Sequence, residues 1–268
     1  MKGKNKTLAI IAGAAGEIGT EFCKSLVNRR IDCLAVIRNR PCAIELGARN
    51  FSQVVCDLEN PLEVKNVFGK IDLESYKKII FIHAIGTDRF EPRGYPIIRP
   101  LETIPSDVYR TNVNSFKYLL RFLTNRLDEW YLDNRYEDHP WVDLKAVIIA
   151  GEADKYAPFV IESFCEAKFI NRGYLHSFLS ILPGWFSGLS VNITSTITRS
   201  ACLTRPFADT RYWLTPQEVV SESIEEIIFG KARYKEISII KPSPDFTEDY
   251  YRSDKMLYEK WSEETGIR

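Results

Sequence analysis

A glycine-rich turn near the N-terminus limits the fold of this chain more than any other feature of the sequence. It follows an apolar run, Leu8–Ala12, that predicts a buried strand, and it leads into Glu17–Asn28, which predicts a helix. Gly13 allows a tight turn, Gly16 lets the backbone approach a diphosphate, and Gly19 lets the helix pack closely on the strand. The helix N-terminus offers free N–H groups and partial positive charge to phosphate oxygens. We therefore predict a diphosphate-binding turn, with a strand–helix turn that holds no ligand as the alternative.

The rest of the chain alternates strands and helices, which predicts a parallel sheet covered by helices on both faces. The further strands are predicted at residues 33–37, 54–56, 79–82, 146–150, 191–197 and 237–240. The further helices are predicted at 62–68, about 105–127, 161–182 and 215–229. No linker divides residues 1–268, so we expect a single α/β domain, Rossmann-like and doubly wound, with a mostly parallel seven-stranded sheet. A polar C-terminal tail, about 242–268, is predicted to end in a short helix at 254–264.

Composition argues against several classes of function. Lys plus Arg equals Asp plus Glu, 36 each, so no global field attracts nucleic acid or an anionic membrane. No apolar stretch approaches the roughly 20 residues that span a bilayer, and the first apolar run is shorter than a secretory signal requires. The six cysteines lack C-x-x-C spacing, and the three histidines do not form a metal site. We therefore expect a cytoplasmic protein that binds no metal, nucleic acid or membrane.

The predicted second strand is followed by two arginines, Arg38 and Arg40. In dinucleotide-binding folds a carboxylate at this point accepts hydrogen bonds from the ribose hydroxyl groups of NAD. An arginine here suits the 2′-phosphate of NADP instead. Because no acidic residue stands at this point, we expect NADP(H) rather than NAD(H) as the cofactor. A solvated basic loop is the alternative.

Together these features resemble the short-chain dehydrogenase/reductase family, from Thr7 to about Ile240. Gly16 stands as in the longer branch of that family, and Glu17 stands where the shorter branch usually has glycine. The resemblance implies an NAD(P)-dependent oxidoreductase. It also implies that the cofactor binds to the glycine turn, which comprises Gly13, Gly16, Glu17, Ile18 and Gly19.

Three further motifs carry the resemblance. The pair Asp57 and Leu58, after the third predicted strand, resembles the pair with which the family contacts adenine. Residues 83–86 stand where the family has Asn-Asn-Ala-Gly, and the resemblance places Ala84 and Gly86 against the cofactor. His83 begins this stretch, and we expect it to be structural, with contact to substrate as the alternative. Asn112 matches the helix asparagine that steadies a proton-relay water in the family.

The catalytic positions depart from the family pattern. The family has Tyr-x-x-x-Lys on the helix after the fifth strand and a serine at the end of that strand. Here Phe164 replaces the tyrosine, Lys168 remains, and Gly151 stands at the serine position. Phe164 cannot donate a proton, and loss of a positioned general acid typically costs about 10²–10⁴ in rate. Lys168 keeps its ability to bond ribose hydroxyl groups, so cofactor binding survives better than catalysis.

A substitute acid would have to come from the loop after the fifth strand. Glu152, Asp154 and Tyr156 lie on this loop, at the carboxyl edge of the sheet where ligands bind. Tyr156 is the best candidate because its phenol is chemically equivalent to the missing one. A solvated loop without a catalytic role is the alternative.

Two functions follow. The first is an atypical NADP-dependent oxidoreductase, acting on a small molecule, whose acid is relocated or whose substrate, such as an imine or a conjugated double bond, needs none. The second is a non-catalytic member of the family that binds the cofactor and acts as sensor, scaffold or partner of another enzyme. The family resemblance favours the first, and the loss of the tyrosine and serine at Phe164 and Gly151 favours the second.

The resemblance also implies assembly. Family members commonly pair through the helices after the fourth and fifth strands, here about 105–126 and 160–182. We therefore expect a homodimer or homotetramer, unless the apolar residues of these helices all face the sheet. The aromatic-rich stretch at 128–142 is either a partner surface or a loop packed on itself.

Overall fold

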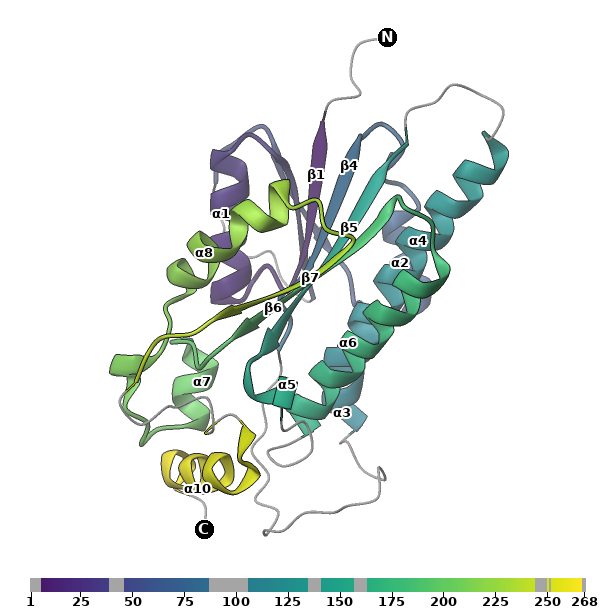
Figure 1. The fold of residues 1–268 in the computed structure, drawn as a ribbon. Coiled ribbons are helices and arrows are strands. Elements are labelled where there is room, and N and C mark those ends of the chain that lie inside the picture. Colours follow the sequence, from purple (N-terminus) through teal and green to yellow (C-terminus); the bar gives the residue numbers. More distant parts are fainter. Residues whose placement is uncertain are drawn as a thin grey trace.

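The computed structural model describes residues 6–38, 46–86, 106–134, 141–156, 163–243, 250 and 252–266. Its centre is a seven-stranded sheet in the order β3-β2-β1-β4-β5-β6-β7, with all neighbouring strands parallel (Figure 1). The strands are β1 (Thr7–Ala12), β2 (Asp32–Ile37), β3 (Phe51–Val55), β4 (Lys78–His83), β5 (Asp143–Gly151), β6 (Phe186–Ile193) and β7 (Tyr234–Ile239). The strand order reverses between β1 and β4, which places a topological switch point beside the glycine turn.

Helices cover both faces of this sheet. On one face lie α1 (Glu17–Asn28) and α8 (Pro216–Phe229), and on the other lie α2 (Pro61–Phe68), α4 (Ser115–Asp133) and α6 (Ser163–Ile181) (Figure 1). The central strands are buried on both sides, which explains why they are continuous apolar runs rather than alternating ones. The predicted doubly wound α/β fold is therefore confirmed, and the sheet is parallel throughout.

Local sequence signals fix where the covering helices begin. The Thr215 hydroxyl accepts a hydrogen bond from the Glu218 N–H (3.1 Å), and the Glu218 carboxylate accepts one from the Thr215 N–H (2.6 Å). This reciprocal cap, followed by Pro216 in the first turn, starts α8 where the sequence predicts it. Asn60 caps α2 in the same way, by accepting a hydrogen bond from the Leu62 N–H (3.0 Å).

The structure corrects several predicted boundaries. The strand predicted at 191–197 begins at Phe186 and ends at Ile193, because the β-branched threonines after it lie beyond the sheet, on the loop that enters the cleft described below. The helix predicted at about 105–127 comprises α3 (Ser106–Tyr109), a π-helical stretch (Arg110–Asn114) and α4. Residues before 106 in that prediction lie outside the described residues.

The carboxyl edge of the sheet carries elements that the sequence did not predict. These are α5 (Ala153–Tyr156), α7 (Arg199–Thr204) and a 3₁₀ turn (Thr210–Tyr212). The C-terminal helix was predicted, and α10 (Asp254–Thr265) lies beside α7 at the lower end of Figure 1. A hydrogen bond from the Phe207 N–H to the Glu264 carbonyl oxygen (3.0 Å) ties α10 to this region.

The aromatic stretch that follows Asp128 packs against its own neighbours where it is described. The Tyr131 hydroxyl donates to the Val142 carbonyl oxygen (2.6 Å) and accepts from the Val142 N–H (2.7 Å). The Tyr131 ring centroid lies 4.3 Å from that of Trp141 and 5.3 Å from that of Trp185. This arrangement favours the self-packed loop, while residues 135–140 lie outside the described residues.

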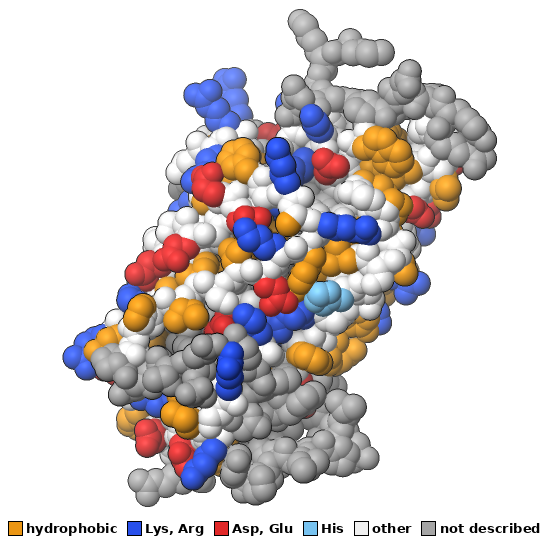
Figure 2. Space-filling model, viewed as in Figure 1, with side chains coloured by type: hydrophobic (Ala, Val, Ile, Leu, Met, Phe, Trp, Pro, Cys, Tyr) orange, Lys and Arg blue, Asp and Glu red, His pale blue; other side chains and the backbone are white. Residues whose placement is uncertain are grey.

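The surface shows charges of both signs. Figure 2 shows Lys and Arg side chains interspersed with Asp and Glu over one face, as the balanced composition leads one to expect. Among the residues that the structure describes, none belongs to a helix long and apolar enough to span a bilayer. The same residues contain no cluster of three or more His, Cys, Asp or Glu side chains arranged to hold a metal ion.

Candidate active site

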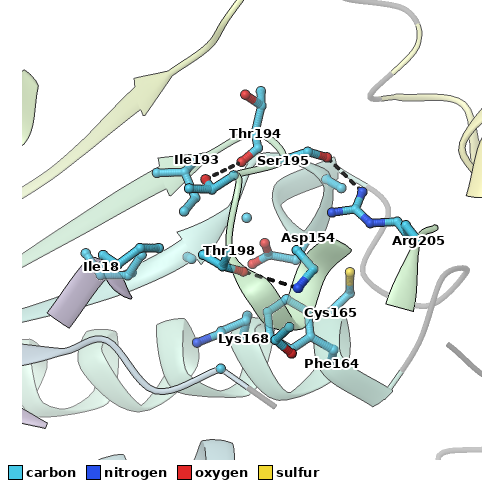
Figure 3. Close-up of a pocket in the computed structure, with 18 of the residues that line it drawn as sticks. Ile18, Asp154, Phe164, Cys165, Lys168, Ile193, Thr194, Ser195, Thr198 and Arg205 are labelled. Atoms are coloured by element: carbon cyan, nitrogen blue, oxygen red, sulfur yellow. Dashed lines mark hydrogen bonds between the residues drawn. The ribbon is translucent and has the colours of Figure 1, made fainter. Parts of the chain in front are cut away.

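A cleft with a cavity of about 270 Å³ opens at the carboxyl ends of the central strands. The glycine turn, the segment 84–86 after β4 and the end of β5 form its inner wall. The start of α6 contributes Phe164 and Lys168, and the loop after β6 contributes residues 193–196 (Figure 3). The outer wall comes from α7 and α10. Open parallel sheets bind ligands at this edge, next to the switch point.

The three glycines of the turn play different parts. Gly13 has a φ of +81°, and a Cβ atom on it would lie 2.9 Å from the Ile85 side chain. A Cβ atom on Gly19 would collide with the Gly13 carbonyl oxygen. Gly16 is exposed at the N-terminus of α1, and the nearest atom to its Cβ position is 3.3 Å away. The backbone therefore requires Gly13 and Gly19, whereas the bare surface at Gly16 fits the close approach of a phosphate group.

The two residues after Gly16 also line the cleft. The Glu17 carboxylate accepts two hydrogen bonds, 2.9 and 3.1 Å long, from the backbone N–H of Arg199. This contact joins the start of α1 to the start of α7, which Thr198 caps by accepting a hydrogen bond from the Ala201 N–H (3.2 Å). Ile18 places its side chain against the inner wall (Figure 3).

Arg38 at the end of β2 is bound to acidic residues of the next loop. Its Nη2 atom donates a hydrogen bond to Glu59, and its Nε atom lies 3.7 Å from the Asp57 carboxylate. Glu59 also accepts a hydrogen bond from the Thr111 hydroxyl (2.8 Å). Leu58, the residue between Asp57 and Glu59 in the sequence, is buried. The guanidinium expected to meet a 2′-phosphate therefore already has anionic partners, while Arg40 lies outside the described residues.

Two of the predicted residues are buried beside the cleft rather than in its wall. His83 has its Nε2 atom 2.8 Å from the Ser115 hydroxyl, and burial together with nearby Lys168 holds its pKa well below the usual value. The Asn112 side chain donates to the Val108 carbonyl oxygen (3.0 Å), within the π-helical stretch. His83 therefore fits the structural role expected for it, and not the alternative of contact with substrate. By contrast, Ala84 and Gly86, which follow His83 within three residues, line the cavity.

Lys168 lies in the cleft, one helical turn after Phe164. Its Nζ atom donates a hydrogen bond to the Ile85 carbonyl oxygen (2.6 Å) and lies 5.3 Å from the centre of the Phe164 ring. Burial lowers the pKa of Lys168 to about 8, although the Asp154 carboxylate opposes this shift. The hydrocarbon ring of Phe164, which has no proton to donate, thus stands next to the lysine.

Asp154 fills the space next to Gly151. Its Oδ1 atom lies 2.5 Å from the Cβ position of Gly151, and its carboxylate is fully buried in the cleft wall (Figure 3). The Arg172 Nη1 atom lies 3.3 Å from Oδ2, but neither oxygen has a hydrogen-bond partner among the described residues. Burial raises the pKa of Asp154 to about 6, against the opposing charges of Arg172 and Lys168. This carboxyl group can therefore carry a proton close to neutral pH.

Tyr156, the substitute acid predicted from the sequence, is the last residue of α5. Its side chain lies outside the described part of the structure. The segment is a helical turn rather than a solvated loop, and that turn is what directs Asp154 inward. Tyr156 was preferred to Asp154 because its phenol is chemically equivalent to the missing one, and the burial of Asp154 could not be read from a short polar segment.

The sequence analysis missed the far end of the cleft altogether. There Arg205, at the end of α7, meets Trp213, Trp261 and Glu264, the last two of which lie on α10. These residues come from three segments that share no motif spacing. The only sequence signal was that apolar residues recur within a polar C-terminal tail, at Leu257 and Trp261.

Comparison with known proteins supports the fold. No protein-family profile matches the sequence, and no curated protein matches it. Among solved structures, a short-chain dehydrogenase from Burkholderia cenocepacia in complex with NADP is 14% identical, with a TM-score of 0.66 over 89% of this chain and 90% of that one. A short-chain dehydrogenase/reductase from Vibrio parahaemolyticus is 17% identical, with a TM-score of 0.67 over 90% and 99%.

A 4-hydroxyisoleucine dehydrogenase complexed with NADH is 21% identical, with a TM-score of 0.61 over 87% of this chain and 97% of that one. The chain therefore has the fold of solved short-chain dehydrogenases/reductases. Because neighbours of this fold hold either NADP or NADH, the likeness does not choose between the two cofactors.

Proposed function

We propose that this protein is an atypical short-chain dehydrogenase/reductase that binds a nicotinamide dinucleotide and reduces a small carbonyl compound or a related imine or enone. The observation that carries the proposal is the continuity of one cleft. It runs from the bare backbone at Gly16 to a buried lysine, Lys168, and a protonatable carboxyl group, Asp154. Perturbed titratable groups in a cleft at the switch point of a parallel sheet favour a catalytic site over a passive pocket.

The chain's own residues fit the cofactor in two places. The N-terminus of α1, with Gly16 exposed, would hold the diphosphate, and Lys168 beside Gly86 would hold the nicotinamide ribose. When bound, the cofactor supplies a hydride to the substrate or removes one from it. The cleft wall at Ala84 and Ile18 is apolar, which keeps water from the reacting centre.

We propose NADP(H) as the preferred form. The absence of an acid directly after β2 and the presence of Arg38 there support this preference. Glu59 and Asp57 work against it, because a 2′-phosphate has to replace their carboxylates as the partner of Arg38. The preference is therefore expected to be modest.

In reduction, we assign the proton to Asp154. As hydride reaches the substrate carbon, the carbonyl oxygen gains negative charge, and the protonated Asp154 carboxyl group transfers its proton to that oxygen. The products are the alcohol and the Asp154 carboxylate, whose charge Arg172 and Lys168 stabilise. This assignment needs neither the phenol nor the serine hydroxyl that the family uses.

A second candidate is a cofactor-binding protein without turnover. The Phe164 ring beside Lys168 favours it, since no phenol is present at the position where the family donates its proton. Such a protein would keep the cleft for sensing or for assembly with another enzyme.

Both candidate functions require binding of a dinucleotide, and calorimetric titration with NADPH and NADH tests whether the protein binds one. Wild type is expected to bind NADPH, and Gly16→Val is expected to abolish binding because its side chain enters the phosphate site. A Cβ atom at Gly16 meets nothing closer than 3.3 Å, so this variant should still fold. Gly173→Ala, at a glycine on α6 with nothing within 4 Å of its Cβ position, is the matched control.

Oxidation of bound NADPH over a panel of ketones, aldehydes, imines and enones then separates the two candidates. Turnover that Asp154→Asn removes supports the oxidoreductase. Tight binding of NADPH with no turnover on any substrate supports the sensor or scaffold. Absence of heat with either dinucleotide at millimolar concentration contradicts both.

A further inference from the structure

The far end of the cleft holds a buried arginine with a fixed orientation. The Arg205 side chain leaves the end of α7, and its guanidinium carbon lies 4.2 Å from the Trp213 ring centroid and 4.6 Å from the Trp261 ring centroid. Only 6% of the residue is exposed. Two aromatic rings this close to a guanidinium stabilise its charge and restrict its movement.

The hydrogen bonds of this guanidinium are incomplete. Its Nη1 atom donates to the Ser195 hydroxyl (2.8 Å) and to the Glu264 carboxylate (3.4 Å). Its Nε atom is buried without a hydrogen-bond partner anywhere in the described part of the chain. A buried donor on a charged group rarely stays unsatisfied, so the Nε–Nη2 edge of Arg205 calls for an acceptor from outside the protein.

This edge faces the reaction site. Figure 3 shows the Arg205 side chain directed from the α7 end toward the middle of the cleft, where Thr198 and Asp154 lie. The second edge, through Nη1, is anchored to Ser195 and points away along the loop after β6 (Figure 3). A ligand that bonds the free edge would therefore extend toward Asp154 and Lys168.

We propose that Arg205 binds a carboxylate group of the substrate, so that this cleft takes carbonyl compounds that carry a carboxylate. The assignment rests on the proposed oxidoreductase function and adds the substrate class to it. The planar fork of two N–H donors on a guanidinium matches the two oxygens of a carboxylate, and the pairing gives both orientation and affinity.

The charges around the cleft favour a carboxylate over a phosphate. The described charged residues that line it are three acids and two bases: Glu17, Asp154, Glu264, Lys168 and Arg205. A phosphate dianion would bring two negative charges into this lining, whereas a carboxylate brings one, beside a guanidinium that forms an ion pair with Glu264. Tyr250, Leu257 and Trp261 line the same end and suit a hydrocarbon body between the carboxylate and the carbonyl.

The test compares two probes of nearly equal shape, 4-oxopentanoate and 4-oxopentanamide, titrated calorimetrically into the chain loaded with NADP⁺, which has no hydride to deliver to either ketone. The carboxylate is expected to bind roughly ten- to a hundredfold more tightly than the amide, the range for a charge-assisted hydrogen-bonded pair. The fluorescence of Trp213 and Trp261, which flank the guanidinium, provides a second readout of the same binding.

The variants are chosen so that the protein remains folded. Arg205→Met alone leaves Glu264 buried without its cation, so the test variant is the pair Arg205→Met with Glu264→Gln. This pair should bind both probes equally and weakly. Arg211→Met is the matched control, because Arg211 lies on the neighbouring 3₁₀ turn with its side chain 78% exposed and bound to Asp209. It should keep the preference for the carboxylate.

Equal binding of the two probes to wild type overturns the proposal, and so does a carboxylate preference that persists in the paired variant. The same titrations on the protein without NADP⁺ keep the two proposals apart. If the protein prefers the carboxylate probe but binds no dinucleotide, the carboxylate site at Arg205 is supported and the oxidoreductase function is contradicted. Turnover of neutral ketones at rates equal to those of keto acids supports the oxidoreductase and contradicts the anion site.

Discussion

The Oδ1 atom of Asp154 lies 2.5 Å from the point that a Cβ atom on Gly151 would occupy. The glycine at 151 and the inward carboxylate of Asp154 are therefore one feature, since any side chain at 151 would compete with this carboxylate for the same space. Any substitution that rebuilds the family site must take account of Asp154.

Gly151→Ser should destabilise the protein, because its Cβ atom forces the buried Asp154 carboxylate out of position. Overpacking of this kind costs on the order of 1–3 kcal/mol. Adding Asp154→Ala should restore most of the loss, and denaturant unfolding of the two single variants and the double variant measures this coupling. If Gly151→Ser lowered the free energy of unfolding equally with and without Asp154, the shared position would be contradicted.

The same pair of residues limits how the family's site can be rebuilt. Only in the Asp154→Ala background should Gly151→Ser with Phe164→Tyr create a serine–tyrosine–lysine site, gaining at most about 10²–10⁴ in the rate of carbonyl reduction.

Asp154 should make stability depend on pH. Burial raises its pKa from 3.8 to about 6, so its contribution is fully present below pH 3.8 and is lost as pH rises through about 6. Asp154→Asn removes the titrating group, so the variant does not lose this stability as pH rises. The free energy of unfolding of the variant relative to wild type should therefore rise between pH 4 and pH 7 by at most about 3 kcal/mol, at roughly 1.4 kcal/mol per pKa unit. A pH-independent difference between the two proteins would show that the carboxyl group does not titrate in this range.

Catalysis should follow the protonation of the same group. If Asp154 donates the proton, kcat/KM for reduction falls as pH rises above about 6, and the reverse oxidation rises over the same range. Asp154→Asn should remove the dependence together with about 10²–10⁴ of the rate. Tyr156→Phe distinguishes the alternative: it should leave the rate and pH profile unchanged here, whereas loss of turnover in that variant identifies Tyr156 as the acid.

The choice of cofactor should respond to Glu59. Glu59→Gln removes one of the two negative partners of Arg38 and leaves Asp57, so it should tighten NADPH binding, by at most about fivefold for a half-exposed pair, without changing NADH binding. Glu225→Gln, at an exposed acid on α8 that pairs with Arg29, is the control. Equal changes in the affinities of NADPH and NADH would show that Arg38 does not meet the 2′-phosphate.

Assembly through α4 and α6 remains a prediction. Most apolar residues of these helices face the sheet, Phe116 and Leu119 among them, but Phe169 on α6 is 44% exposed. Figure 2 shows hydrophobic side chains gathered over α6 on the face it presents. Light scattering should give about twice the monomer mass of 30.9 kDa, and Phe169→Glu should reduce it to the monomer. Phe229→Glu, at an exposed position at the end of α8, should leave the mass unchanged.

The fold was predictable because its signals are local. Continuous apolar runs mark the buried parallel strands, and the threonine and proline at 215 and 216 mark the start of α8. The structure confirms both predictions. Boundaries failed where intrinsic preference and tertiary context disagree. The threonines after Ile193 have strand propensity, but β6 and β7 end at Ile193 and Ile239, and beyond them Thr196 forms only an isolated bridge with Leu214.

The candidate site was predictable only in part. The glycine turn and Lys168 belong to spaced motifs, so the sequence identified them. The inward position of Asp154 depends on one helical turn, α5, that is too short for a periodic pattern. Arg205 depends on α10, which is 49 or more residues away along the chain, and no local pattern records such a contact.

The packing of α10 has a consequence for how the protein is made. The seven-stranded sheet is complete once β7, Tyr234–Ile239, has been synthesised, and the glycine turn has its place from the first strand onward. The wall that holds Trp261 and Glu264 against Arg205 comes from a later segment. The sheet and the glycine turn are therefore encoded ahead of this wall, and α10 is the last of the described elements to be made. Selectivity for the substrate would then rest on residues 254–265, a segment that adds no strand to the sheet.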